Sequence, residues 1–165
     1  MKHNFSGFIW APAIQFHNEV LEHINNSYPV LHFYKYNFTD IKLYKKSILD
    51  IYTTDDIDPR TVENFKIKSM LSCPLTYIHF KIYVGEPDFR KKGNGNNISR
   101  VIERIKKDVR GKWKAGVKNY VYDNIVHICD NFDQTIKTEK IIKKYGKYMK
   151  KTFINLKYFL KCNFV

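Results

Sequence analysis

Hydrophobic positions follow two different periods along this chain, and the two alternate. Short apolar runs and two-residue alternation, rich in β-branched and aromatic residues, predict strands at residues 5–11, 30–38, 74–84 and 124–129. Apolar residues spaced three and four apart predict helices over residues 14–24, 41–51, 62–70, 98–113 and 133–145. Asp40, and Asp58 followed by Pro59, are typical N-terminal caps for the two middle helices.

This order of strands and helices predicts an α+β protein with a ferredoxin-like (split βαβ) fold. We expect a four-stranded antiparallel sheet with helices packed on one face. Residues 86–97 combine Gly, Pro, Asn and charge, which predicts a loop. The length suits one domain over residues 1–165, with a core at about 5–145 and a basic, aromatic C-terminal extension at 146–165.

The composition is that of a folded, basic protein. Twenty-nine Lys and Arg against sixteen Asp and Glu give a formal charge of +13, which favours phosphate-bearing partners such as nucleotides and nucleic acids. Cys73, Cys129 and Cys162 lack the paired spacing of a zinc site, so reduced thiols are expected. The chain has neither an apolar leader nor a run of about eighteen apolar residues, which predicts a cytoplasmic protein without a membrane span.

His127 stands in the middle of the apolar strand at 124–129. Such a histidine is usually a core residue with a hydrogen-bonded ring. However, the segment Asn124-Ile-Val-His127-Ile-Cys-Asp130 resembles the active-site segment of nucleoside diphosphate kinases, Asn-Ile/Leu-Ile/Val-His-Gly-Ser-Asp. Val109-Arg110-Gly111 is similar to the family's Thr-Ile-Arg-Gly, and Ser72-Cys-Pro74 to its Ser-Gly-Pro. The order of elements agrees over residues 5–145.

The resemblance implies that His127 is transiently phosphorylated while a γ-phosphate passes from a nucleoside triphosphate to a diphosphate. Neutral imidazole is a competent nucleophile near pH 7. Arg110 would bind phosphate oxygens and Asn124 the sugar, and Arg104 or Arg100 would supply a second guanidinium. Mg²⁺ would be held by the nucleotide, with no metal ligand from protein side chains. Family members form dimers or larger homo-oligomers, which is the expectation here.

Two departures from the family pattern lie at this site. Where the family has Lys-Pro-Asp, the chain has Ile9-Trp10-Ala11-Pro12, so the family lysine is missing and Lys91 or Lys92 would have to replace it. The Gly-Ser after the histidine is Ile128-Cys129, which puts a thiol in place of a hydroxyl. Cys129 would support the site or simply pack in the core. Asp130, like Asp133, would cap the following helix.

The hypothesis is therefore a nucleotide-binding phosphotransferase, an enzyme with an atypical site that transfers a phosphoryl or nucleotidyl group through His127. The alternative is a non-catalytic ferredoxin-like module that binds RNA or single-stranded DNA through its basic surface. The C-terminal extension interleaves lysines with aromatic rings, as single-strand-binding surfaces do. Its apolar residues also fit a helix with a core-facing stripe, and a membrane-surface helix is a third interpretation.

Overall fold

The computed structural model describes residues 4–153 apart from residues 56, 94 and 122. The strands are β1 (Asn4–Trp10), β2 (Val30–Asn37), β3 (Thr76–Tyr83), β4 (Phe89–Lys91), β5 (Asn97–Ser99), β6 (Val126–Ile128) and β7 (Lys150–Phe153). The main helices are α1 (His17–Asn25), α2 (Ile41–Tyr52), α3 (Pro59–Thr61), α4 (Lys68–Met70), α5 (Arg100–Trp113) and α6 (Phe132–Gly146). Short helical segments are η1 (Ala11–Phe16), η2 (Thr53–Asp55), the π-helical η3 (Val62–Ile67) and η4 (Lys114–Gly116).

The main sheet has the strand order β6-β1-β3-β2-β7, and every pairing in it is antiparallel. The four predicted strands are β1, β2, β3 and β6, and their order is that of a split βαβ sheet. The predicted ferredoxin-like fold is therefore confirmed.

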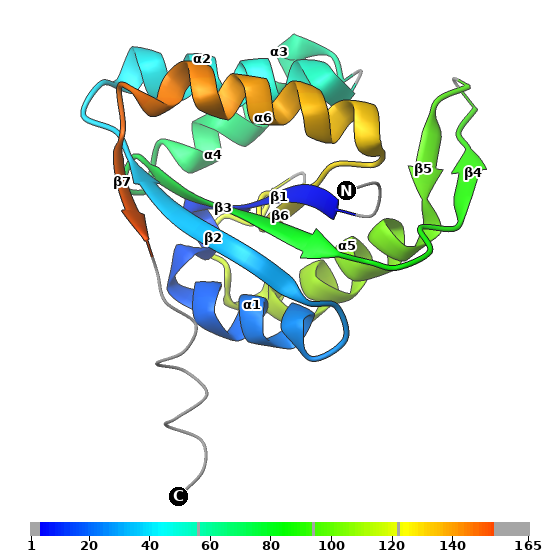
Figure 1. Ribbon diagram of the computed structural model, residues 1–165. Coiled ribbons are helices and arrows are strands. Elements are labelled where there is room, and N and C mark those ends of the chain that lie inside the picture. The colour runs from blue at the N-terminus through cyan, green and yellow to red at the C-terminus, as the bar shows by residue number, and fades with distance from the viewer. Residues whose placement is uncertain (1–3, 56, 94, 122, 154–165) are drawn as a thin grey trace, which may run out of the picture.

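Helices cover both faces of this sheet, so the expectation of helices on one face was wrong (Figure 1). Along β1, Phe5 and Ile9 pack with α1 and α5, whereas Phe8 and Trp10 pack with α2 and α6. We call these the α1/α5 face and the α2/α6 face. Six of the seven residues of β1 are buried, because helices cover both sides of the strand.

The C-terminal extension adds a fifth strand instead of continuing the helix. α6 ends at Gly146, and β7 then pairs with β2 at the edge of the sheet, from Tyr34 opposite Phe153 to Asn37 opposite Lys150. The interpretation as one continued helix was therefore wrong for residues 147–153. Residues 154–165 lie outside the described residues.

The predicted loop at 86–97 contains a two-stranded hairpin. Strand β4 pairs with β5 in a sheet of its own, with Phe89 opposite Ser99 and Lys91 opposite Asn97. The hairpin projects beyond the main sheet next to the start of α6 (Figure 1). The sequence concealed it because both strands are only three residues long and β4 is exposed at every position.

Side-chain caps begin α2 and α3 at the residues that the sequence predicted. Asp40 accepts hydrogen bonds from the amides of Lys42 and Leu43, and Asp58 accepts one from Arg60. The cap of α6 is Asn131, which accepts from the amide of Gln134, so Asp130 and Asp133 do not cap it. Among the described residues, no helix is long and apolar enough to cross a membrane.

Candidate functional site

His127 sits on the short edge strand β6, opposite Phe8 of β1, and its ring points to the α2/α6 face. Aromatic rings of Phe8, Trp10 and Tyr52 lie around it, with centroids 6.1, 6.3 and 5.2 Å away. The residue is only 3% exposed. In this conformation the imidazole is enclosed, whereas the sequence hypothesis requires a phosphate to reach it.

The two nitrogens of the His127 ring have different surroundings. Nδ1 lies 3.4 Å from a carboxylate oxygen of Asp55, whereas Nε2 is buried without a hydrogen-bond partner among the described residues. Burial lowers the pKa of His127 to about 4, against the opposing effect of Asp55. The ring is therefore neutral at pH 7, and the carboxylate favours the tautomer with its proton on Nδ1 and a free electron pair on Nε2.

Asp55 belongs to a chain of polar contacts that the sequence did not reveal. Its other oxygen accepts a hydrogen bond of 2.5 Å from the side-chain amide of Gln134. The Gln134 carbonyl in turn accepts from the backbone amide of Asp130, also at 2.5 Å. The first turn of α6 thus fixes the carboxylate that orients the histidine.

Asp130 is the anionic centre of a small ion cluster. Its buried carboxylate contacts Lys92 and lies 2.5 Å from the ammonium of Lys106. Burial by itself would raise the pKa of Asp130, but the two lysines outweigh it and the pKa is lower than usual. Asp130 therefore binds two lysines from different elements, whereas the sequence had predicted that it caps the helix.

Arg110 is one helical turn beyond Lys106 on α5. Its guanidinium donates to the carbonyl of Val126, at 3.0 Å from Nη2, and lies 3.0 Å from the carboxylate of Asp123. Arg110 of α5 thus binds Val126, the residue that precedes His127 on β6. Folding therefore brings the arginine that was predicted to bind phosphate near the histidine.

Arg110 and Lys106 line a cleft of about 640 Å³ between α5, the hairpin and the loop that precedes β6. We call it the basic cleft, and its lining residues are Lys92, Ile98, Glu103, Lys106, Lys107, Arg110, Gly111, Lys114, Tyr120 and Asp123. Five of them are cationic and two carry a carboxylate. This volume is within the range of small-molecule sites, about 300–1,000 Å³.

Lys66 is a residue that the sequence hypothesis missed. It is 7% exposed, and its ammonium lies 4.9 Å from the centre of the Tyr52 ring that also contacts His127. Burial, followed by the nearby Arg110, lowers the pKa of Lys66 to about 8. A signal existed in the sequence, because the lysine is four residues from both Val62 and Met70, the apolar stripe of the helix.

Three other predicted site residues are engaged elsewhere. The amide of Asn124 is fully buried, where it contacts Ser69 and accepts from the backbone of Val121, so a sugar would have to displace one of these partners. Arg100 lies 3.6 Å from Asp88. Arg104 is exposed, and neither arginine lines the basic cleft.

The three residues proposed to replace the missing lysine or to support the site differ in their placement. Lys92 lines the basic cleft, whereas its neighbour Lys91 is exposed on β4 and does not. Cys129 is fully buried, with its sulfur 3.4 Å from the hydroxyl of Thr138, and burial raises the pKa of its thiol to about 12. A thiol in this state is packing and not a nucleophile.

No group of three or more His, Cys, Asp or Glu side chains that could hold a metal exists among the described residues. Two carboxylates belong to the candidate site, and both already have partners. Asp55 accepts a hydrogen bond from Gln134, and Asp130 forms ion pairs with two lysines. These residues do not suit direct ligation of Mg²⁺. The ion would have to arrive with phosphate oxygens as its ligands.

Comparison with known proteins gives one kind of match. No family model matches this chain, and no curated protein does. Among solved structures, the chain is similar to an NDP kinase from Pyrobaculum aerophilum, with 10% sequence identity over 86% of this chain and 95% of that one, at a TM-score of 0.48.

Proposed function

We propose that this protein binds a nucleoside di- or triphosphate, with the phosphates in the basic cleft. The observation that carries the proposal is the convergence of Lys92, Lys106 and Arg110 on one cleft, where Arg110 also binds the backbone of the strand that carries His127. Asp130 and Asp123 hold these cations in place before any ligand arrives, which reduces the entropy lost on binding. Mg²⁺ would bind with the nucleotide and be held by its phosphates.

Two further lysines supply charge that internal ion pairs do not consume. Lys107 and Lys114 line the cleft and are exposed, and neither has an ion-pair partner within the described part of the chain. Phosphate oxygens are the natural partners of such a group of cations. The +13 formal charge of the chain adds a long-range attraction for the same ligand.

Binding is tested by titrating ATP and ADP, each with Mg²⁺, into the protein and recording the heat. Replacing Lys107 and Lys114 by Ala should weaken binding about tenfold, since about 1.4 kcal/mol corresponds to a factor of ten in affinity. The matched control is Lys140→Ala with Lys143→Ala, two exposed lysines of α6 away from the cleft, which should leave affinity unchanged. Equal loss in both double variants would reduce the effect to general charge and defeat the proposal.

Phosphoryl transfer through His127 is the second candidate, and the unpartnered Nε2 of a neutral, oriented ring favours it. In the first half-reaction a bond from nitrogen to the γ-phosphorus forms as the bond to the bridging oxygen breaks, and the diphosphate leaves. A second diphosphate then takes the phosphoryl group in the reverse step. Because the ring is enclosed, this transfer requires movement of Tyr52 or its neighbours.

Transfer is tested with γ-labelled ATP. A phosphohistidine is labile in acid and stable in alkali, and it should be absent from His127→Ala. Equal label in that variant refutes the role of His127, and absence of label in the wild type, with nucleotide binding intact, leaves a binding protein. Light scattering in the same buffer tests the expected homo-oligomer.

The nucleic-acid alternative predicts a different response. Single-stranded RNA would bind with strong dependence on salt, because phosphate contacts release counterions, and free nucleotide would not compete. In the extension, Lys151 lies 3.6 Å over the ring of Tyr34, and Lys147 lies 4.9 Å over that of Tyr148. These rings already have cations beside them, which makes the described part of the extension a weaker platform for bases.

A further inference from the structure

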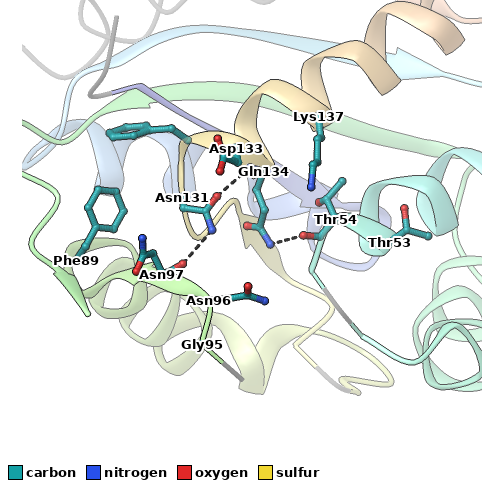
Figure 2. Close-up of a pocket in the computed structure, with 11 residues that line it drawn as sticks. Thr53, Thr54, Phe89, Gly95, Asn96, Asn97, Asn131, Asp133, Gln134 and Lys137 are labelled. Carbon is teal, nitrogen blue, oxygen red and sulfur yellow. Dashed lines mark hydrogen bonds between the residues drawn. The ribbon is translucent and has the colours of Figure 1, made fainter. Parts of the chain in front are cut away.

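A second hollow lies on the other side of the hairpin from the basic cleft. It has a volume of about 360 Å³ and lies between the hairpin, η2 and the start of α6. Figure 2 shows amide side chains from two elements around it: Asn96 and Asn97 from the hairpin, and Asn131 and Gln134 from the start of α6. We call it the amide pocket.

The pocket and the cleft share the hairpin as a wall. Asn97 lines the amide pocket and the next residue, Ile98, lines the basic cleft, as expected for neighbours in a strand. Likewise Lys92 on the cleft side donates its backbone amide to the carbonyl of Asn96 on the pocket side, at 2.8 Å. Ligands in the two sites would therefore lie on opposite sides of one thin element.

Two of the amides are fixed before any ligand binds. Asn131 donates to the carbonyl of Asn97 at 2.9 Å and accepts from the amide of Gln134 at 2.9 Å. Gln134 donates to the carbonyl of Thr54 at 2.6 Å and to Asp55. These bonds make the floor of the pocket rigid, which favours recognition of a ligand of fixed shape.

An aromatic ring stands at the edge of this polar hollow. Phe89 is 38% exposed and packs edge-on against Phe132 at 5.3 Å, which itself packs on Phe5 at 5.0 Å. The ring is therefore held from behind, and part of it remains free for a ligand. Exposed aromatic rings are the usual stacking surface for nucleobases.

The charge of the amide pocket differs from that of the cleft. Asp133 and Lys137 are its only charged lining residues, one of each sign, and the remainder are amides, hydroxyls, a glycine and two phenylalanines. An amide offers a donor and an acceptor side by side, which matches the edge of a nucleobase. A neutral, planar, hydrogen-bonding ligand fits this lining better than a phosphate does.

We propose that the amide pocket is a nucleobase site, in which the base stacks on Phe89 and presents its edge to Asn97. The inference rests on the proposed function, because it extends the binding of nucleotide-type ligands to a second site, which the hairpin separates from the phosphates in the basic cleft. It also connects the pocket to His127. Gln134 lines the pocket and donates a hydrogen bond to Asp55, which lies beside the His127 ring. A ligand that binds the Gln134 amide would therefore change the position of Asp55 relative to that ring.

The test uses two probes that each contain half of a nucleotide. Uncharged nucleosides (adenosine, guanosine, cytidine and uridine) probe the amide pocket, and inorganic tripolyphosphate probes the basic cleft. Binding is followed by nuclear magnetic resonance, with the His127 ring nitrogens as reporters. We expect at least one nucleoside to bind and to shift the His127 signals, and tripolyphosphate to bind independently.

Variants locate the nucleoside. Asn97→Ala removes an exposed side chain, and Phe89→Ala removes the ring. Each should weaken nucleoside binding at least tenfold and leave tripolyphosphate binding unchanged. Asn64→Ala, which removes an exposed amide on η3, is the matched control and should change neither. Should Phe89→Ala fail to fold, Asn97→Ala alone decides the location.

The outcomes separate this inference from the proposed function. If tripolyphosphate and ATP bind but no nucleoside does, the base site is wrong and the phosphate site stands. If nucleosides bind equally well to Asn97→Ala and to the wild type, they bind elsewhere and the inference is overturned. If neither tripolyphosphate nor ATP binds, the proposed function itself fails.

Discussion

The two faces of the main sheet differ in what they bury. The α1/α5 face is apolar throughout its core cluster, with aliphatic residues from α1 and α5 packed on Phe5, Ile9 and Phe80. The α2/α6 face buries tyrosines and a tryptophan together with His79, Lys66 and His127. One face of the sheet therefore buries an apolar core, and the other face also buries titratable groups.

This difference separates stability from chemistry. Apolar burial stabilises the fold at any pH, whereas a buried imidazole or ammonium costs free energy whenever its charged form has to be desolvated. His127 and Lys66 lie near one another on the α2/α6 face, where both are beside the Tyr52 ring. The candidate site also draws on α5, whose Lys106 contacts the buried Asp130. The predictions below test the contrast in order of expected effect.

Phe80→Ala should give the largest loss of stability. Phe80 is fully buried on the α1/α5 face in the central strand β3, and truncation of such a residue costs about 3–5 kcal/mol. Urea unfolding measures this loss of free energy of unfolding. Leu31→Ala, which truncates an apolar side chain that is 49% exposed, is the control and should cost less than about 0.5 kcal/mol. A loss below about 1 kcal/mol for Phe80→Ala would show that this face is not the main source of stability.

Acidification should destabilise the protein through the α2/α6 face. Burial lowers the folded-state pKa of His127 to about 4 and that of His79 to about 3, from an unfolded value of 6.5. The unfolded state therefore binds more protons, and stability is lost as the pH falls from 6.5 toward these values. His127 alone should account for roughly 3 kcal/mol.

The measurement is urea unfolding between pH 7 and pH 4.5. This range keeps the buried Asp130, whose pKa is lower than usual, in its ionised form. His127→Phe should lose clearly less stability than the wild type over the same range. An identical loss in both proteins would mean that the ring is accessible to solvent and not enclosed.

Gly7→Ala should have an intermediate effect on the α1/α5 face. A Cβ atom at Gly7 would lie 2.5 Å from the tip of the Phe80 ring, which is fully buried and has no room to withdraw. Such overpacking costs about 1–3 kcal/mol. Thermal unfolding would reveal it, and adding Phe80→Leu to Gly7→Ala should remove the clash. If the double variant is as unstable as the sum of the two single changes, the clash is not the cause.

Tyr44→Phe should show the smallest effect. The buried hydroxyl of Tyr44 donates to the carbonyl of Thr76 at 3.2 Å on the α2/α6 face, and its loss should cost about 1 kcal/mol. Tyr148→Phe, at a half-exposed ring, should be neutral by the same urea assay. Equal values for the two would indicate that the hydroxyls of this face contribute nothing to stability.

Several features of the fold followed directly from the sequence. The alternation at 30–38 and the apolar run at 74–84 predicted β2 and β3, and Asp40 marked the start of α2. These signals are local, since side-chain periodicity and capping depend on neighbours within a few residues. The hairpin and β7 were not predicted, because strands of three or four residues are too short to show such a pattern.

The candidate site was predictable only in part. His127, Arg110 and Asp130 came from one resemblance in the sequence, and the structure places them within a few contacts of one another. Asp55 and Gln134 could not be found in this way, because they are separated by 79 positions and meet only through folding. Lys66 carried a weak signal, because it falls on the apolar stripe of its helix.

By itself the sequence determined the order of elements, the ferredoxin-like sheet and the excess of positive charge, because these depend on periodicity and composition. Only the tertiary structure decided that His127 is enclosed, that Asp55 orients it, and that the cations of α5 and the hairpin meet on one wall. The physical reason is that exposure, tautomer and ion pairing depend on which distant groups exclude water from a residue. No local pattern of side chains specifies that.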